Sequence, residues 1–159
     1  MLTTRLADKA RPSPDTPAGA GPPTRPAEAD DPHAGLEELK VMIVDDEFLA
    51  AWHLQALLED MGVVHSELAH DGPSALATAR RFQPDLVLMD MNLGAASFDG
   101  AETARRLLAE RPLRLIFITA YGDPGTLDLI HTAAPDADVL IKPANPARLR
   151  DLVVGGRRH

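Results

Sequence analysis

The sequence predicts an α/β fold, in which an open parallel sheet is covered by helices on both faces. Two observations support this fold class. From Leu36 onward, short apolar runs alternate with stretches whose apolar residues recur at three- and four-residue spacing, which is typical of buried strands alternating with helices. Five such strand-and-helix units follow one another, and right-handed crossovers between them give a doubly wound sheet.

Four predicted strands are short apolar runs, and the remaining strand is a weaker alternating stretch. The apolar runs cover residues 39–44, 85–89, 113–118 and 138–141, and the alternating stretch, second along the chain, covers residues 63–69. Central strands of a parallel sheet are buried on both faces and are therefore apolar throughout. We expect the strand at 63–69 to lie at an edge of the sheet.

The first predicted helix follows the strand at 39–44. Its recurring apolar residues are Leu49, Trp52, Ala56 and Leu57. Their three- and four-residue spacing predicts that this stretch is a helix. Gly62 suits the end of this helix, because glycine readily adopts the left-handed conformation found there.

Capping signals mark the beginnings of two later helices. The third predicted helix starts at Asp99, whose carboxylate can accept from the helix backbone, and Glu102 can reach back as in a capping box. The last starts at Asn145 and Pro146, a favoured cap and first-turn pair.

Composition divides the 159-residue chain into a leader, one folded domain and a tail. Residues 1–35 contain seven of the 14 prolines and almost no large apolar side chains, so they cannot bury enough surface to offset the entropy of ordering. We predict a disordered leader at 1–35, a domain at 36–154 and a tail at 155–159.

Charge and composition exclude several classes of protein. The net charge of −8 argues against binding to DNA or to an anionic membrane. The chain has no cysteine, which excludes disulfides and thiolate metal sites. Its apolar runs are too short for a signal peptide or a membrane span. We expect a cytoplasmic protein.

Acidic residues follow two of the predicted strands. Asp45 and Asp46 come directly after the strand at 39–44, and Asp90 comes directly after the strand at 85–89. The carboxyl ends of parallel strands meet at one edge of the sheet, so these acids should converge. Clustered carboxylates repel one another unless a cation neutralises them. Mg²⁺ prefers such oxygen ligands, with Mn²⁺ as an alternative.

A hydroxyl and an ammonium follow the last two strands. Thr119 ends the fourth strand, and Lys142 and Pro143 follow the fifth. Each alone has an ordinary explanation, since threonine favours strands and lysine favours the surface. An ammonium beside carboxylates and a cation, however, suits the oxygens of a phosphoryl group.

This set of residues resembles the receiver domains of response regulators in two-component signalling. The family pattern is an acidic pair, a phosphoacceptor Asp, a Thr or Ser, and a Lys-Pro, each after successive strands, and the resemblance covers about residues 38–154. It implies a flavodoxin-like (βα)5 sheet with strand order 2-1-3-4-5. It also implies that Asp90 accepts a phosphoryl group from a sensor histidine kinase or a phosphotransfer protein.

The resemblance implies a role for each residue of the set. The implied Mg²⁺ ligands are Asp46 and Asp90 directly, Asp45 through water, and the backbone carbonyl of Asn92. Thr119 and Lys142 would bind the phosphoryl group. The peptide bond between Lys142 and Pro143 would be cis.

Two positions depart from the usual switch of the family. An aromatic residue commonly lies three residues before the family's lysine, where this chain has Val139. Tyr121 follows Thr119 in a stretch that resembles the Phe-Ala-Thr-Gly-Tyr motif of the FAT GUY receivers, with Ile118 and Ala120 in place of Ala and Gly. We predict that Tyr121 moves on phosphorylation and signals in place of Val139. The alternative is that Tyr121 only covers the sheet edge.

Other functions stay open on the sequence alone. A phosphohydrolase that forms an aspartyl phosphate usually needs a second acid two residues after the nucleophile, where this chain has Asn92. A receiver-like interaction module without phosphorylation does not need the complete set of strand-end residues. Phe98 is expected to pack locally rather than to cover the phosphoryl site. Output is expected through an unidentified protein target or a phosphorelay, and the family also allows a homodimer.

Overall fold

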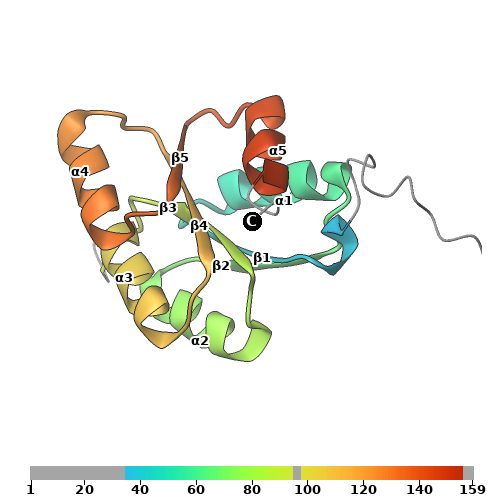
Figure 1. Ribbon diagram of the computed structural model, residues 1–159, viewed down its shortest axis with the longest axis horizontal. Helices are drawn as coiled ribbons and strands as arrows, with labels where there is room; N and C mark the ends of the chain where they lie inside the picture. Colours follow the sequence, from blue (N-terminus) through green and yellow to red (C-terminus); the bar gives the residue numbers. More distant parts are fainter. Residues whose placement is uncertain (1–34, 95–97, 156–159) are drawn as a thin grey trace, which may run out of the picture. The chain divides into compact units, whose positions relative to one another are not determined.

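Five parallel strands form one open sheet in the order β2-β1-β3-β4-β5 (Figure 1). The strands are β1 (Lys40–Val44), β2 (His65–Ala69), β3 (Leu86–Asp90), β4 (Arg114–Thr119) and β5 (Asp138–Ile141). The predicted fold class and strand order are therefore confirmed, and β2 lies at an edge as expected. The computed structural model describes residues 35–94 and 98–155, so nearly all of the predicted leader and tail lies outside the described residues.

Helices cover both faces of the sheet. They are α1 (Phe48–Met61), α2 (Gly72–Phe82), α3 (Gly100–Glu110), α4 (Pro124–Ala133) and α5 (Pro146–Gly155), and a short 3-10 turn, η3 (Leu36–Glu38), precedes β1. Helices α1 and α5 lie on one face, and α2, α3 and α4 lie on the other (Figure 1).

Alternate residues of the central strands fill two separate cores. In β3, Val87 and Met89 pack beneath α2, α3 and α4, whereas Leu86 and Leu88 pack beneath α1 and α5. All four side chains are buried. Each contributes about 1.5–3 kcal/mol through burial of apolar surface. A strand with helices on both sides must be apolar on both sides, which explains the unbroken apolar runs of the sequence.

The predicted helix ends are mostly confirmed. Gly62 ends α1 with a left-handed φ of 110°. The Asp99 carboxylate accepts from the backbone N–H of Glu102 at 2.9 Å, and the side chain of Asn145 accepts from the backbone N–H of Arg148 at 2.9 Å.

Of the two interactions in the capping box predicted at the start of α3, only the one made by Asp99 is present. Asp99 caps the helix, but the Glu102 carboxylate does not turn back to it. Instead it accepts from Arg105 at 3.1 Å and from Arg106 at 2.7 Å. Two cationic neighbours within one helical turn attract the carboxylate more strongly than a neutral backbone N–H does.

The helix predicted after β1 is confirmed, but the apolar residues whose spacing predicts it are not the residues that α1 buries. Leu49, Trp52 and Ala56 are exposed and Leu57 is only partly buried, with Leu49 74% exposed. The residues of α1 that are buried are Ala51, Leu54, Leu58 and Met61. Apolar residues lie on both sides of this helix, so helical spacing alone fits more than one inward face.

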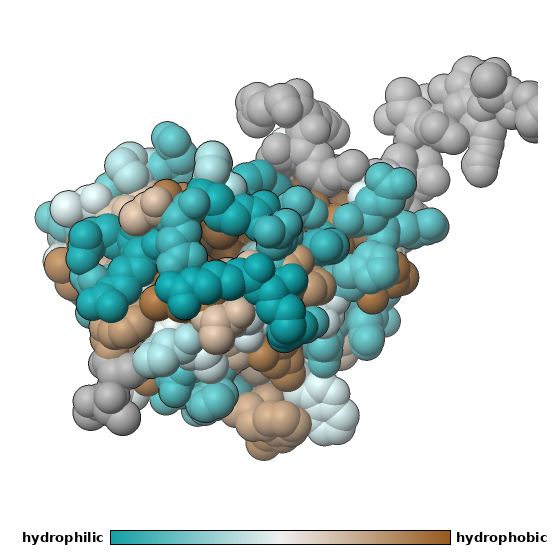
Figure 2. Space-filling model, turned by 90° about the horizontal axis from the view of Figure 1, so that it is seen from below, coloured by the Kyte–Doolittle hydropathy of each residue, from teal (hydrophilic) through white to brown (hydrophobic). Residues whose placement is uncertain are grey.

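Charged side chains gather on the face of the sheet that carries α2. Arg80 pairs with Glu110 of α3 at 2.6 Å, and Arg81 pairs with Glu67 of β2. Figure 2 shows a broad band of hydrophilic side chains on the side of the molecule that is lowest in Figure 1. Exposed ion pairs of this kind add little stability. Within the described ranges, no helix has the length and hydropathy needed to cross a bilayer.

Candidate functional site

Three carboxylates meet at the carboxyl ends of β1 and β3. The two strands are neighbours in the sheet, with Val44 paired to Met89, so Asp45 and Asp46 emerge beside Asp90. One carboxylate oxygen from each lies within 4.8 Å of the others. Asp45 is 2% exposed and Asp90 is 7% exposed, whereas Asp46 is exposed to solvent. The convergence predicted from the strand order is therefore present.

The ammonium of Lys142 lies against two of these carboxylates. Lys142 Nζ lies 3.3 Å from Asp45 Oδ2 and 3.5 Å from Asp90 Oδ2. Its backbone N–H donates to the carbonyl of Thr119 at 2.8 Å, which joins the ends of β4 and β5. The peptide bond between Lys142 and Pro143 is cis, as expected.

The electrostatics of the site leave negative charge uncompensated. Burial, together with the charge of Asp45, raises the pKa of Asp90 to about 6 even though Lys142 acts in the opposite direction. For Lys142, burial disfavours the charged ammonium, but the charges of Asp90 and Asp45 outweigh this effect and raise its pKa. One ammonium therefore does not fully neutralise the acids around it.

The donor set fits a hard divalent cation. Asp45, Asp46 and Asp90 offer carboxylate oxygens that face one another, and Mg²⁺ prefers such ligands. Asn92 lies beside them, because its backbone N–H donates to Asp90 Oδ1 at 3.4 Å. Burial and the charge of Asp45 raise the pKa of Asp90, and a bound cation would favour its ionised form.

Thr119 and Tyr121 complete the rim of the same cavity. The cavity has a volume of about 260 Å³ and is lined by Asp46, Glu47, Asp90, Asn92, Thr119, Ala120, Tyr121 and Lys142. The hydroxyl oxygen of buried Thr119 accepts from the backbone N–H of Tyr121 at 3.1 Å. The Tyr121 side chain is 60% exposed. Val139 is half-buried and packs on the core beneath α2, α3 and α4, away from this rim.

Comparison with known proteins agrees with this geometry. Residues 41–154 match the response regulator receiver domain family. The chain belongs to this family. Receiver domains of two-component systems are typically phosphorylated and bind Mg²⁺ in an acidic pocket.

Individual relatives are similar over the receiver region. An uncharacterised response regulatory protein of Vibrio cholerae is 37% identical over 113 residues, which are 68% of this chain and 41% of that protein. A protein-glutamate methylesterase/protein-glutamine glutaminase of Rhodospirillum rubrum is 32% identical over 100 residues, which are 61% of this chain and 26% of that protein. The chain thus spans less than half the length of either relative. The methylesterase name belongs to that protein.

A solved structure shows the same fold. The CheY-like receiver domain protein of Methanospirillum hungatei superposes with a TM-score of 0.67 at 27% identity, covering 74% of this chain and 93% of that chain. Membership of the FAT GUY subgroup stays a prediction.

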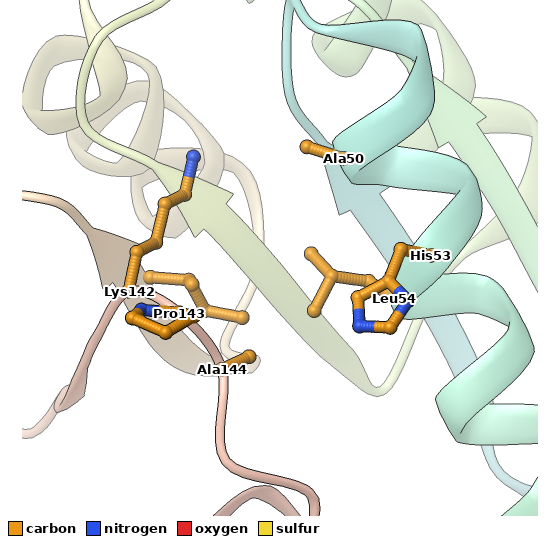
Figure 3. Close-up of a pocket in the computed structure, with 7 residues that line it drawn as sticks. Ala50, His53, Leu54, Lys142, Pro143 and Ala144 are labelled. Atoms are coloured by element: carbon orange, nitrogen blue, oxygen red, sulfur yellow. The ribbon is translucent and has the colours of Figure 1, made fainter.

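A second, apolar cavity of the receiver borders the acidic one. It has a volume of about 380 Å³ and is lined by Ala50, His53, Leu54, Ile118, Lys142, Pro143 and Ala144. Figure 3 shows side chains of α1 on one side and the segment from Lys142 to Ala144 on the other. Sequence reasoning missed this cavity because its two walls are some ninety residues apart and consist of ordinary apolar side chains. Lys142 lines both cavities.

Gly100 brings the start of α3 directly against the backbone of Asp90. Its N–H donates to the carbonyl of Met91 at 2.9 Å. A Cβ added at Gly100 would lie 2.2 Å from the carbonyl oxygen of Asp90, closer than any real contact. A side chain at this position would therefore displace the backbone of Asp90. The sequence indicates only that a helix begins here, so this close approach was not predicted.

Proposed function

We propose that this receiver accepts a phosphoryl group on Asp90 from a histidine kinase or a phosphotransfer protein, with Mg²⁺ bound, and thereby changes its contacts with other proteins. The observation that carries the proposal is the position of Asp90. Its carboxylate lies 3.5 Å from the ammonium of Lys142, and two further carboxylates lie within 4.8 Å. Family membership supports the same function, since receiver domains interact with such phosphodonors.

The proposed transfer is a single displacement at phosphorus. A P–O bond forms to a carboxylate oxygen of Asp90 while the P–N bond to the donor imidazole breaks, and the imidazole nitrogen keeps the electron pair. Lys142 offsets negative charge on the phosphoryl oxygens, and the Thr119 hydroxyl donates to one of them. When bound, Mg²⁺ supplies further positive charge at these oxygens. Asp45, Asp46, Asp90 and the Asn92 carbonyl would hold it.

Slow loss of the phosphoryl group is part of the proposal. Asn92 lines the acidic cavity two residues after Asp90. Its amide cannot donate or take up a proton as a carboxyl does in acid-base catalysis. The phosphorylated state would therefore last long enough to be read by another protein, which suits a signalling domain and disfavours a phosphohydrolase.

Readout is proposed to pass through Thr119 and Tyr121. The phosphoryl group itself carries up to about two negative charges, and they would lie beside Thr119. When the Thr119 hydroxyl turns toward a phosphoryl oxygen, its present bond from the backbone N–H of Tyr121, 3.1 Å long, changes. Movement of this loop would carry the exposed ring of Tyr121 with it. Val139 lacks the aromatic ring needed for the family's usual switch.

Intact-mass spectrometry of the full chain tests the proposal. After incubation with acetyl phosphate and Mg²⁺, the wild type should gain the mass of one phosphoryl group. Asp90→Asn should gain none, and EDTA should prevent the gain in the wild type. A wild type that gains no mass under these conditions would leave only an interaction module. Steady turnover of small phosphate esters would instead favour a phosphohydrolase.

A further inference from the structure

A half-buried aromatic ring lies at the far end of the loop between β3 and α3. Phe98 packs on the core beneath α2, α3 and α4. Its ring occupies the space that a side chain on the first residue of α2 would need, because a Cβ added at Gly72 would lie 2.3 Å from Phe98 Cε2. The guanidinium carbon of Arg106 lies over the ring, 4.1 Å from its centroid. Phe98 therefore packs locally, as predicted, and it contacts two helices at once.

The same loop is fixed at three other points. Leu93, only 3% exposed, belongs to the core on which Phe98 packs, and so does Met91. At the far end, the N–H of Gly100 donates to the carbonyl of Met91 at 2.9 Å. Among the described residues of the loop, Met91, Leu93 and Phe98 are thus the apolar anchors.

Close to Asp90, the backbone N–H of Asn92 makes only a long hydrogen bond. Its N–H donates to Asp90 Oδ1 at 3.4 Å, and its side-chain oxygen accepts from the N–H of Gly94 at 3.2 Å. Gly94 has a left-handed φ of 84°. Mg²⁺ requires near-ideal geometry, with ligand distances of about 2.0–2.1 Å, so ligands must be held to within about 0.5 Å. The long backbone hydrogen bond of Asn92 does not supply that precision by itself, so the packed residues of the loop must contribute to it.

We propose that Phe98, seated against Gly72 and Arg106, is a positioning residue for the Mg²⁺ site. By holding the start of α3, where the Gly100 N–H bonds the carbonyl of Met91 next to Asn92, it sets the affinity for the cation without touching it. This proposal rests on the function proposed above. It also links the beginning of α2 to the phosphoacceptor, so that a change in the packing of α2 alters the metal site.

Calorimetric titration of the full chain with MgCl₂ alone, at neutral pH, tests this role. Phe98→Ala should bind Mg²⁺ about tenfold more weakly than the wild type, in line with the effect of residues that support metal ligands. Gly72→Ala should also weaken binding, because the added methyl displaces the ring. Phe98→Leu, which keeps an apolar anchor, should lie between Phe98→Ala and the wild type.

Two further variants separate positioning from general damage. The double variant Gly72→Ala/Phe98→Ala lacks the ring that the added methyl would meet. Its affinity for Mg²⁺ should therefore equal that of Phe98→Ala alone. Gly155→Ala is a matched glycine control, since no described atom lies within 4 Å of a Cβ added there, and it should bind Mg²⁺ like the wild type. Urea unfolding shows whether each variant is folded, and Phe98→Leu carries the test if Gly72→Ala is not.

The outcomes distinguish the two proposals. If folded Phe98→Ala and Phe98→Leu bind Mg²⁺ as tightly as the wild type, even with reduced stability, Phe98 only packs and the positioning role is overturned. If the wild type itself binds no Mg²⁺, the proposed function fails, and the role of Phe98 fails with it.

Discussion

The surroundings of Asp90 disfavour the ionised form of its carboxylate. Burial and the charge of Asp45 raise its pKa from 3.8 to about 6, so at neutral pH the metal-free protein keeps a charged group that it would hold more easily when neutral. A nucleophile must nevertheless be ionised to attack phosphorus. A cation beside Asp90 would favour the ionised form and so supply both charge balance and reactivity.

The raised pKa of Asp90 predicts how stability depends on pH. Asp90 binds a proton more tightly in the folded state than in the unfolded state. The stabilisation that this proton gives is fully present below the unfolded pKa of 3.8 and is lost as pH rises through about 6. In EDTA, Asp90→Asn should therefore be more stable than the wild type at pH 8, by on the order of 2–3 kcal/mol. The difference should shrink as pH falls toward 4.5.

Urea unfolding over this pH range measures the effect. Added Mg²⁺ should stabilise the wild type at pH 8 and remove much of the advantage of Asp90→Asn. If the two proteins differ in free energy of unfolding by the same amount at every pH, the charge of Asp90 does not destabilise the folded state.

At the scale of elements, α1 shows what sequence periodicity cannot decide. Leu49 and Leu54 both lie on this helix, and both have helical spacing to other apolar residues. Leu54 packs on the sheet and is 5% exposed, whereas Leu49 is exposed together with Phe48 and Trp52. The exposed rings of Phe48 and Trp52 lie against each other, with their centroids 5.9 Å apart.

A matched pair of substitutions tests which face of α1 is inward. Leu54→Ala should lower the free energy of unfolding by about 2–5 kcal/mol, because it opens a cavity in the core. Leu49→Ala should change it by no more than about 0.5 kcal/mol, as for an exposed site. Denaturant unfolding of the two variants measures both. Equal losses, or a larger loss for Leu49→Ala, would contradict the assignment of Leu54 to the inward face.

The loop after β4 is the element proposed to report phosphorylation. In the wild type, treatment with beryllofluoride should change the affinity for a captured protein partner. In Tyr121→Ala this change in affinity should be smaller, because the moving ring is absent. Val139→Ala is the control and should keep the difference. An unchanged ratio in Tyr121→Ala would assign the signal to another element.

At the scale of the whole molecule, the sheet and the site could be predicted together. In a parallel sheet the strand ends share one edge, so the residues after each strand converge once the strand order is known. Asp45, Asp46, Asp90, Thr119 and Lys142 were found in this way. The strand bounds differ by one or two residues at most, because the apolar runs are short and end in polar residues.

Features that depend on contacts between distant segments could not be predicted. The apolar cavity between α1 and the segment after β5 has no local signal, because each wall is ordinary by itself. The close approach of Gly100 to Asp90, and of Phe98 to Gly72, depends on how α2, α3 and the loop after β3 pack. The roles of the site residues and the proposed output through a protein target stay predictions.

The central claim is that Asp90 is the phosphoacceptor, and peptide mapping after reduction tests it most directly. The full chain is incubated with acetyl phosphate and Mg²⁺ and then treated with borohydride, which reduces an aspartyl phosphate to homoserine. We expect homoserine at position 90 and unmodified aspartate at positions 45 and 46. Homoserine at another aspartate, or none in a protein that is folded and has bound Mg²⁺, would contradict this claim.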